Sequence, residues 1–256
     1  MAVVTFTTDF GTSDAYVGAM KGVVLSLAPE AVLVDITHQV PRQDVAAGAL
    51  ALAQAAPLFP PGSIHVAVVD PGVGGQRADL VVEAAGSIYV GPDNGVLAMA
   101  AQPPRQAFRI DNPHFRREPV SPTFHGRDVF AVAAGRIARG AAPREVGPAL
   151  SAIVELAVMA DGPLAGECRA SVVHVDGFGN LVTSLVGGRT DGNWQVQCGE
   201  RHFAVAGGRS YADVGVGALI VYEGSSGRIE IAVRDGSAAL LLGARAGSQL
   251  ELSRQS

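Results

Sequence analysis

Cysteine is scarce in this sequence. Only Cys168 and Cys198 occur among 256 residues. Two cysteines are too few for a disulfide framework, and neither has the spacing to histidine of a metal site. The sequence therefore predicts a protein without disulfides or a bound metal, suited to the reducing cytoplasm.

Long apolar runs and clusters of basic residues are missing as well. No run approaches the roughly 20 apolar residues that span a bilayer, and Met1 leads into a strand-like segment without the basic start of a signal peptide. Lys and Arg number 19 against 24 Asp and Glu, for a net charge of -5. Binding of nucleic acid or of an anionic membrane needs clustered positive charge, so neither partner is expected.

The sequence is instead rich in apolar residues, at 48%, with 17% charged residues. This balance is typical of well-packed domains, and 256 residues suffice for two of them. In residues 1–162, β-branched runs alternate with apolar residues at helical spacing, which predicts an α/β layered domain with a largely parallel sheet. Strands are expected at Val3–Thr7, Val32–Ile36, Ile64–Val69 and Leu80–Glu83, and helices at Tyr16–Leu27, Val45–Leu58 and from Gly126 through Ile137.

Residues 167–256 have a different pattern. Short strand-like runs are separated by Gly, Asp, Asn and Ser turns, which predicts a small antiparallel β-barrel or sandwich without helices. Prolines at 143, 148 and 163 mark the approach to a linker, so the domain boundary is expected between Asp161 and Glu167. The expected strands are Val172–Val175, Leu181–Leu185, Trp194–Gln197, Ala218–Tyr222, Ile229–Val233 and Leu250–Leu252.

Polar residues follow the first strand in the segment Thr7-Thr8-Asp9-Phe10-Gly11-Thr12-Ser13-Asp14. Ligands of α/β sheets bind beyond the carboxyl ends of strands, and a carboxylate there can accept from both hydroxyls of a ribose. Asp9 is therefore a candidate ligand residue, with stabilisation of the turn as the alternative. Asp14 is expected to cap the following helix.

An acidic residue also ends the third run, where Asp70 is followed by a Gly-rich loop and then by Arg77. The arginine is close enough in sequence to fold back and pair with Asp70. The loop lacks both the Lys-Ser or Lys-Thr of a P-loop and the spacing of a dinucleotide-binding loop. By itself, the pattern favours a tight turn with an incidental surface ion pair.

Two further polar loops occur in the first domain. Gly91-Pro92-Asp93-Asn94-Gly95 is typical of a turn, although the Asn94 amide could also contact a sugar or a base. Thr123-Phe124-His125-Gly126-Arg127-Asp128 places a histidine ahead of a helix, where it could contact a ligand. A lone histidine is more commonly structural, and Arg127 and Asp128 are expected to hold the loop and the helix start.

The second domain holds polar loops that are equally ambiguous. His174-Val175-Asp176-Gly177-Phe178-Gly179-Asn180 is typical of a hairpin turn, with an aromatic tip that could stack on a purine. Ser225-Ser226-Gly227-Arg228 and Arg234-Asp235-Gly236-Ser237-Ala238 form two more such loops.

Together these motifs resemble those of the S-adenosylmethionine hydrolases that form adenosine, the hydroxide adenosyltransferases related to fluorinase and chlorinase. The resemblance runs nearly end to end, through TTDFGTSD, DITH, VVDPGVG, GPDNG, TFHGRD, HVDGFGNLVTS and SSGRIEIAVRDGSAA. It implies an α/β domain followed by a small β-barrel, and cleavage of S-adenosylmethionine at ribose C5′ by water or hydroxide. It also implies a homotrimer that holds the ligand between one subunit's first domain and its neighbour's second.

The resemblance also implies roles for single residues. Asp70, Arg77 and His125 correspond to the catalytic Asp-Arg-His set of the hydrolases. Asp9 would hold the ribose hydroxyls, and Asp176 would meet the methionine ammonium. The remaining substrate-binding residues would be Asn94, Phe124, Phe178, Asn180, Ser226 and Arg234.

Individual positions separate the branches of this family. Halogenating relatives carry Tyr at the position of Asp70, whereas the hydrolase pattern has Asp70, Val73 and His125, as this chain does. Gln43 stands where relatives often have an aromatic residue near the methionine, which bears on packing around the S-methyl group. Displacement at C5′ requires no metal or other cofactor.

Three other functions remain open from the sequence. A metal-dependent phosphohydrolase would use Asp9, Asp14, Asp70 and Asn94 as oxygen ligands for a divalent ion. A halide-using adenosyltransferase would make 5′-halo-adenosine. A binding module would hold S-adenosylmethionine or adenosine without turnover, although binding alone would not demand the Asp-Arg-His set.

Overall fold

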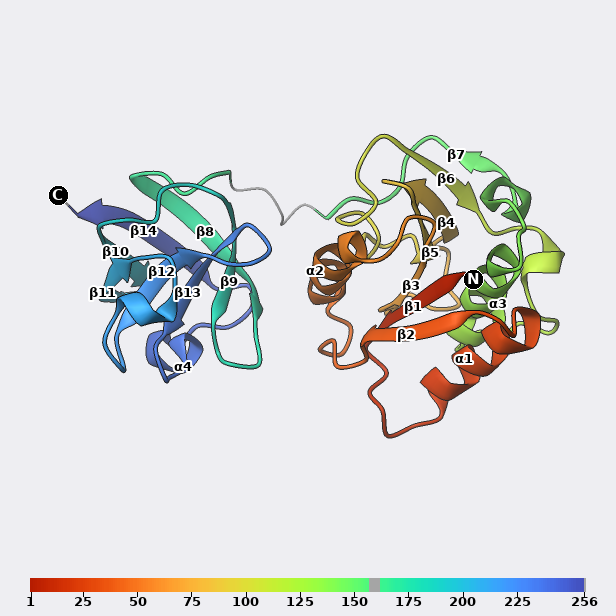
Figure 1. Ribbon diagram of the computed structural model, residues 1–256, viewed down its shortest axis with the longest axis horizontal. Helices are drawn as coiled ribbons and strands as arrows, with labels where there is room; N and C mark the ends of the chain where they lie inside the picture. The colour runs from red at the N-terminus through yellow and green to blue at the C-terminus, as the bar shows by residue number, and fades with distance from the viewer. Residues whose placement is uncertain (157–161, 256) are drawn as a thin grey trace. The chain divides into compact units, whose positions relative to one another are not determined.

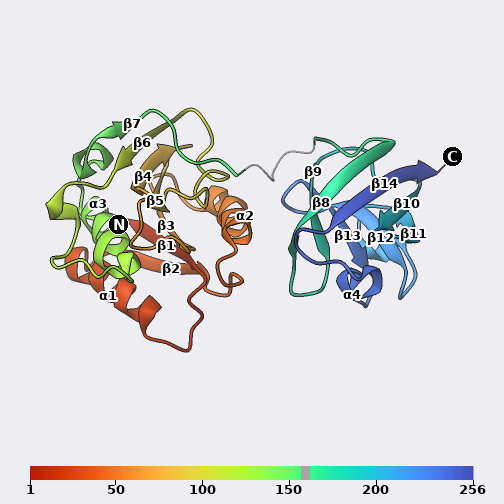
Figure 2. The same ribbon diagram turned by 180° about the vertical axis from the view of Figure 1, so that it is seen from behind.

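The computed structural model describes residues 1–156 and 162–255. The chain divides into two compact units, Met1–Leu156 and Ala157–Ser256, whose elements are labelled in Figures 1 and 2. The expected domain boundary begins at Asp161, which lies outside the described residues. Within those residues, no helix combines the length and the apolar character that crossing a membrane requires.

The first unit contains a seven-stranded sheet with the strand order β2-β1-β3-β5-β4-β6-β7. Strands β2, β1, β3 and β5 pair in parallel, whereas β4, β6 and β7 add antiparallel pairings. This confirms the predicted α/β class. The strands are β1 (Val3–Thr8), β2 (Val32–Thr37), β3 (Ile64–Val68), β4 (Asp79–Ala84), β5 (Ser87–Pro92), β6 (Arg105–Arg109) and β7 (Ala149–Leu150).

Helices cover both faces of this sheet (Figure 1). Helices α1 and α3 share one buried cluster with Val66 and Val68 of β3, whereas α2 shares another with Ala67 and Val69. Neighbouring residues of a strand point to opposite faces, so one strand supplies both clusters. The helices are α1 (Tyr16–Leu27), α2 (Val45–Ala55) and α3 (Ala131–Ala138), with short turns η1 (Ala56–Leu58), η2 (Pro113–Phe115), η4 (Pro143–Val146) and the π-helical turn η3 (Gly126–Phe130).

The prediction that Asp14 caps α1 is wrong. The helix begins at Tyr16, so Ala15 is the N-cap, and no side chain bonds to the first turn. Asp14 lies one residue too early in the chain to occupy the capping position. By contrast, Asp44 caps α2 through a hydrogen bond of 2.9 Å from the Ala47 amide.

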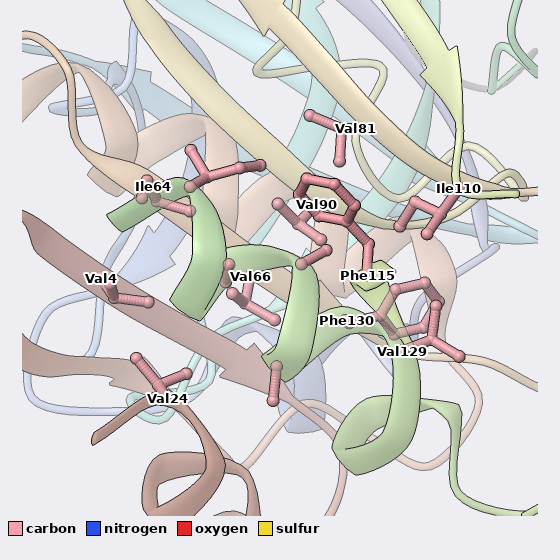
Figure 3. Close-up of a cluster of buried hydrophobic side chains, with 14 of the residues drawn as sticks. Val4, Val24, Ile64, Val66, Val81, Val90, Ile110, Phe115, Val129 and Phe130 are labelled. Atoms are coloured by element: carbon pink, nitrogen blue, oxygen red, sulfur yellow. The ribbon is translucent and has the colours of Figure 1, made fainter. Parts of the chain in front are cut away.

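The first cluster packs residues of β1, β3, β4 and β5 against α1 and α3, and part of it is drawn in Figure 3. Its side chains are almost completely withdrawn from water, and each Val, Ile, Phe or Met among them contributes roughly 1.5–3 kcal/mol by burial. The members labelled in the figure are Val4, Val24, Ile64, Val66, Val81, Val90, Ile110, Phe115, Val129 and Phe130.

The pairing register of the strands brings three chain segments to one edge of the sheet of the first unit. Thr8 at the end of β1 pairs with Val68 at the end of β3. Strand β4 runs the other way, so its first residue, Asp79, pairs with Pro92 at the end of β5. The residues after β1, the residues after β3 and the start of β4 therefore lie at the carboxyl edge of the parallel strands.

The second unit is a closed barrel with the order β10-β11-β12-β13-β9-β8-β14. All pairings are antiparallel except β11 with β12, which confirms the predicted barrel. Trp194 is among the largest side chains in its interior. The strands are β8 (Glu167–Val175), β9 (Leu181–Val186), β10 (Asn193–Cys198), β11 (Arg201–Gly207), β12 (Leu219–Glu223), β13 (Arg228–Val233) and β14 (Gln249–Gln255).

The expectation that no helix follows Gly166 is wrong. Helix α4 (Ala238–Leu242) and the turn η5 (Tyr211–Asp213) interrupt the strands. Ser237 caps α4 by accepting from the Leu240 amide at 3.2 Å, and Gly243 ends the helix in the left-handed conformation. With five residues, α4 is too short to show a helical period in the sequence.

His65 is a buried titratable group in the sheet of the first unit. Its side chain in β3 is fully buried, with Nδ1 2.8 Å from Thr5 Oγ1 and its ring stacked on Tyr89. Burial lowers the pKa of His65 from 6.5 to about 4. The folded state thus binds a proton at this site less readily than the unfolded chain does.

We expect the free energy of unfolding to fall as the pH is lowered through the window from about 6.5 to about 4. The loss should reach about 3.5 kcal/mol at most, because the pKa falls from 6.5 to about 4 and one pKa unit corresponds to about 1.4 kcal/mol. Urea unfolding at a series of pH values measures it. His65→Gln should flatten this part of the profile, whereas the exposed His114→Gln should not. Equal slopes in wild type and His65→Gln would contradict the prediction.

Candidate active site

A pocket with a volume of ≈ 260 Å³ lies at the carboxyl edge of the parallel strands. The segments after β1 and β3 form part of its wall, and the loop before η3 forms another part. It is lined by Asp9, Phe10, Asp14, Tyr16, Arg42, Gln43, Val68, Asp70, Val73, Thr123, Phe124, His125 and Gly126. The sequence-predicted residues Asp9, Asp70, Phe124 and His125 thus meet in one place.

Asp9 is held at the pocket by backbone contacts. Its Oδ2 accepts from the Gln43 amide at 2.9 Å, and the amide of Gly11 donates to the His38 carbonyl at 2.8 Å. His38 is itself fixed, with Nδ1 2.8 Å from Thr8 Oγ1. The DITH motif therefore supports the loop that carries Asp9. Oδ1 of Asp9 has no hydrogen-bond partner within the described residues and can accept from a ligand.

Asp70 and Arg77 form a two-point ion pair inside the pocket wall. Arg77 Nε donates to Asp70 Oδ1 at 3.0 Å, and Nη2 donates to Oδ2. The Arg77 side chain is only 10% exposed and that of Asp70 only 4%, so the interpretation as an incidental surface pair is wrong. Burial acts to lower the pKa of Arg77, but hydrogen bonds and charges from Asp70 and Asp79 outweigh it and raise that pKa.

A glycine brings this loop against the histidine loop. Gly74 has a φ of +74°, and a Cβ at this position would clash with the carbonyl oxygen of Pro122. Only glycine tolerates both the left-handed conformation and this close approach. Gly74 thereby allows the segment between Asp70 and Arg77 to pack on the segment that precedes His125.

His125 stands at the start of the π-helical turn η3, a conformation that is frequent at functional sites. Its Nδ1 lies 3.2 Å from Arg77 Nη2 and 3.1 Å from Asp79 Oδ1. Asp128 holds the preceding loop, because it accepts from the Ser121 amide at 2.9 Å and from the Arg127 guanidinium. This is the role expected for Arg127 and Asp128.

Asp79 is a site residue that the sequence analysis missed. Its side chain is 6% exposed, and Oδ1 accepts from Arg77 Nη1 while Oδ2 lies 3.5 Å from Arg116 Nη2. In sequence, Asp79 is simply the residue before an apolar strand. Asp79 lies two residues after Arg77, which was the available signal in the sequence. Its place beside Arg77 in the structure is decided by the antiparallel pairing at the start of β4.

Three aromatic rings were also not recognised as a group. Phe10, Tyr16 and Phe124 pack edge to face, with centroids 5.2 to 6.1 Å apart. The guanidinium of Arg127 lies over the Phe124 ring at 5.0 Å from its centroid. These rings give part of the pocket wall an apolar surface.

Asn94 does not line this pocket. Its Nδ2 donates to the Val69 carbonyl at 2.8 Å, and its Oδ1 accepts from the Val96 amide at 3.1 Å. Both polar atoms of the side chain therefore support the backbone beside Asp70. In the part of the chain that the structure describes, no group of three His, Cys, Asp or Glu residues is placed to hold a metal ion, and the proposed phosphohydrolase ligand set is not assembled.

The second unit has an apolar pocket of its own, with a volume of ≈ 700 Å³. Phe178 at its rim is 81% exposed. Ser226 is not part of its lining, and its Oγ is buried without a partner among the described residues. The pocket is lined by Phe178, Asn180, Tyr211, Ala212, Val233, Arg234, Asp235 and Gly236.

A chain of hydrogen bonds fixes the loop at this pocket. Asp176 accepts from the amides of Phe178 and Asn180 at 2.9 Å, and from Asn180 Nδ2 at 2.8 Å. Asn180 Nδ2 also donates to the Tyr211 hydroxyl. That hydroxyl lies 2.8 Å from the Tyr222 hydroxyl, which donates to Glu230 Oε2 at 2.7 Å. Burial raises the pKa of Glu230. Asp176 thus shapes the turn that presents Phe178.

Comparison with known proteins shows which family the chain resembles. Models of the SAM hydroxide adenosyltransferase N-terminal and C-terminal domains match residues 4–147 and 170–251. The (R)-S-adenosyl-L-methionine hydrolase of Salinispora tropica is 40% identical over 255 residues, which cover 98% of this chain and 97% of that protein. The fluorinase of Nocardia brasiliensis is 26% identical over 293 residues, covering 98% of this chain and 96% of that protein.

A solved structure agrees with these matches. The crystal structure of an uncharacterized conserved protein from Thermotoga maritima superposes with a TM-score of 0.89 at 30% identity, covering 99% of this chain and 100% of that one. The two family models together span most of the sequence. This chain belongs to the SAM hydroxide adenosyltransferase family.

Proposed function

We propose that this chain hydrolyses S-adenosyl-L-methionine at ribose C5′ and releases adenosine and L-methionine. The observation that carries the proposal is the buried cluster of Asp70, Arg77 and His125 in the wall of a pocket that also holds Asp9. The 40% identity to a protein named as a hydrolase supports the same reaction, against 26% for a fluorinase.

The difficult part of this reaction is the nucleophile. The sulfonium of S-adenosylmethionine is already a good leaving group, so sulfur needs no general acid. Water attacks weakly, and it must be held about 3 Å from C5′ in line with the departing sulfur. Asp70 and His125 are placed to hold this water, while Arg77 keeps the Asp70 carboxylate in position.

Charge in the pocket favours a cationic substrate and a neutral nucleophile. Three carboxylates, Asp9, Asp14 and Asp70, line the first-domain pocket and outnumber its single guanidinium, Arg42. Exclusion of bulk water would strengthen their attraction to the sulfonium. A halide anion would instead be repelled by the carboxylate of Asp70, which argues for the hydrolase over a halide-using adenosyltransferase.

The first-domain pocket is small for the whole substrate, because ligand sites usually measure about 300–1,000 Å³. We therefore include in the proposal a homotrimer in which a neighbour's second domain completes the site. The exposed Phe178 ring suits stacking on adenine, and the pocket beside it is apolar. Neither a cofactor nor a metal takes part. Both cysteines are free thiols, which suits an enzyme of the cytoplasm.

The direct test is chromatography of S-adenosylmethionine incubated with the enzyme, with and without chloride, in ¹⁸O-labelled water. We expect adenosine and methionine in both conditions and one labelled oxygen on the adenosine 5′-hydroxyl. A substrate made chiral at C5′ with deuterium should give inverted adenosine, because a single in-line displacement inverts carbon. A 5′-chloro product, unlabelled adenosine or loss of activity with a chelator would each contradict the proposal.

Asp70→Ala should lower turnover by roughly 10²- to 10⁴-fold, the range for loss of a positioned acid-base group. Adenosine affinity should stay nearly unchanged, because Asp70 is assigned to the water and not to the ribose. Steady-state kinetics and calorimetric titration with adenosine measure the two effects. Asp111→Ala, which removes an exposed carboxylate paired with Arg109, is the matched control. Equal losses in turnover and adenosine affinity would make Asp70 a binding residue.

The intersubunit site is tested by complementation. Asp70→Ala damages the first domain and Phe178→Ala truncates an exposed ring of the second, so each variant alone should lose activity. Co-expressed variants should regain about a quarter of the wild-type sites, since each mixed trimer holds one site with both residues intact. If a single subunit forms the whole site, mixed oligomers recover nothing.

A further inference from the structure

The Nδ1 atom of His125 faces two different groups. Asp79 Oδ1 lies 3.1 Å away and can only accept a hydrogen bond, whereas Arg77 Nη2 lies 3.2 Å away and can only donate one. Nδ1 thus carries a hydrogen if it donates to Asp79, and lacks one if it accepts from Arg77. This choice decides which nitrogen of the ring is free to take a proton.

The contacts around the ring favour the bond to Asp79. Two carboxylates, Asp70 and Asp79, are balanced by Arg77 and by Arg116, which lies 3.5 Å from Asp79 Oδ2. Arg77 Nη2 already donates to Asp70. Without its hydrogen, Nδ1 would direct a lone pair at a carboxylate oxygen 3.1 Å away. With it, Nδ1–H donates a charge-assisted bond, which is about twice as strong as a neutral one.

The opposite side of the ring is open. His125 Nε2 makes no hydrogen bond within the described residues, and the 14% exposed side chain lines the first-domain pocket. When a partner holds Nδ1–H, the neutral imidazole has its lone pair on Nε2. Asp79 is not itself a lining residue of that pocket.

We infer that Asp79 is a positioning residue that holds His125 with its proton on Nδ1, so that Nε2 takes the proton of the attacking water. This inference rests on the proposed function. One O–H bond of the water breaks and its proton passes to Nε2, while oxygen forms the bond to C5′. The C5′–S bond breaks, and its electron pair stays on sulfur as the methionine thioether. The imidazolium, stabilised by Asp79, later returns its proton to solvent.

The resting enzyme provides the first test, because it needs neither substrate nor a variant of Asp79. Long-range ¹H–¹⁵N NMR distinguishes the ring forms of the six histidines, and His125→Gln assigns the signals of His125. At a pH where the ring is neutral, we expect hydrogen on Nδ1 and none on Nε2. Hydrogen on Nε2 would overturn the inference. If the spectra show hydrogen on Nδ1 but the enzyme does not hydrolyse S-adenosylmethionine, the inference about the ring stands and the proposed function is refuted.

Variants then connect the ring form with turnover. Asp79→Asn keeps the shape of the side chain but removes its charge, so a substantial share of His125 should move to the Nε2–H form. We expect kcat to fall roughly tenfold or more, with KM changed less than about twofold, because Asp79 does not line the pocket. An unchanged ring form and an unchanged kcat in a folded Asp79→Asn protein would refute the assignment.

The matched control is Arg116→Gln, which removes another neighbour of Asp79 and leaves the carboxylate. Arg116 lies 3.5 Å from Asp79 Oδ2 and donates to the Ile110 carbonyl. The control should keep the Nδ1–H form and a kcat within about twofold of wild type. A loss of kcat as large as that of Asp79→Asn, with the ring form unchanged in both, would reduce Asp79 to a merely structural contact.

Discussion

The buried guanidinium of Arg77 is the constraint on which the candidate site depends. A charge withdrawn from water is tolerated only when it is paired and hydrogen-bonded. Asp70 and Asp79 supply that pairing, and the planar arginine fixes the direction of the N–H bonds that it donates to them. Because His125 Nδ1 touches the same guanidinium and one of the same carboxylates, a single side chain sets the positions of three others.

The topology of the sheet makes this pairing possible. Asp70 follows a parallel strand, and Asp79 begins an antiparallel one, so the chain must leave the sheet and re-enter it at the same edge. The intervening loop does this within a few residues, and Gly74 lets it lie against the loop of His125. The change from parallel to antiparallel pairing beside β5 is thus what brings a second carboxylate to Arg77.

Sequence patterns predicted the elements that show a clear helical or strand period. They did not predict side-chain positions that depend on pairing between strands. The helix at Tyr16–Leu27 was predicted to the residue, and the apolar strands of both units were found. Strand β6 begins and ends with arginine, and strand β11 begins with Arg201 and ends with Gly207. Helix α4 is shorter than two helical turns, so none of the three shows a clear pattern. The pairing of Asp70 with Arg77 follows from their short separation. Asp79 was missed because its partner loops come together only through the sheet.

The pairing around Arg77 also bears on the choice of nucleophile. The carboxylates of Asp70 and Asp79 are balanced by Arg77 and Arg116. The pocket beside them adds Asp9 and Asp14 against a single guanidinium, Arg42, so one negative charge is left over. Such a field attracts a sulfonium cation and opposes an anion at the same place. A neutral water then needs a group that accepts its proton. The His125 ring, oriented by Asp79, is suited to this role because the nearby carboxylate stabilises the positive charge that the ring gains with the proton. The carboxylates that stabilise the buried arginine therefore also favour water over halide.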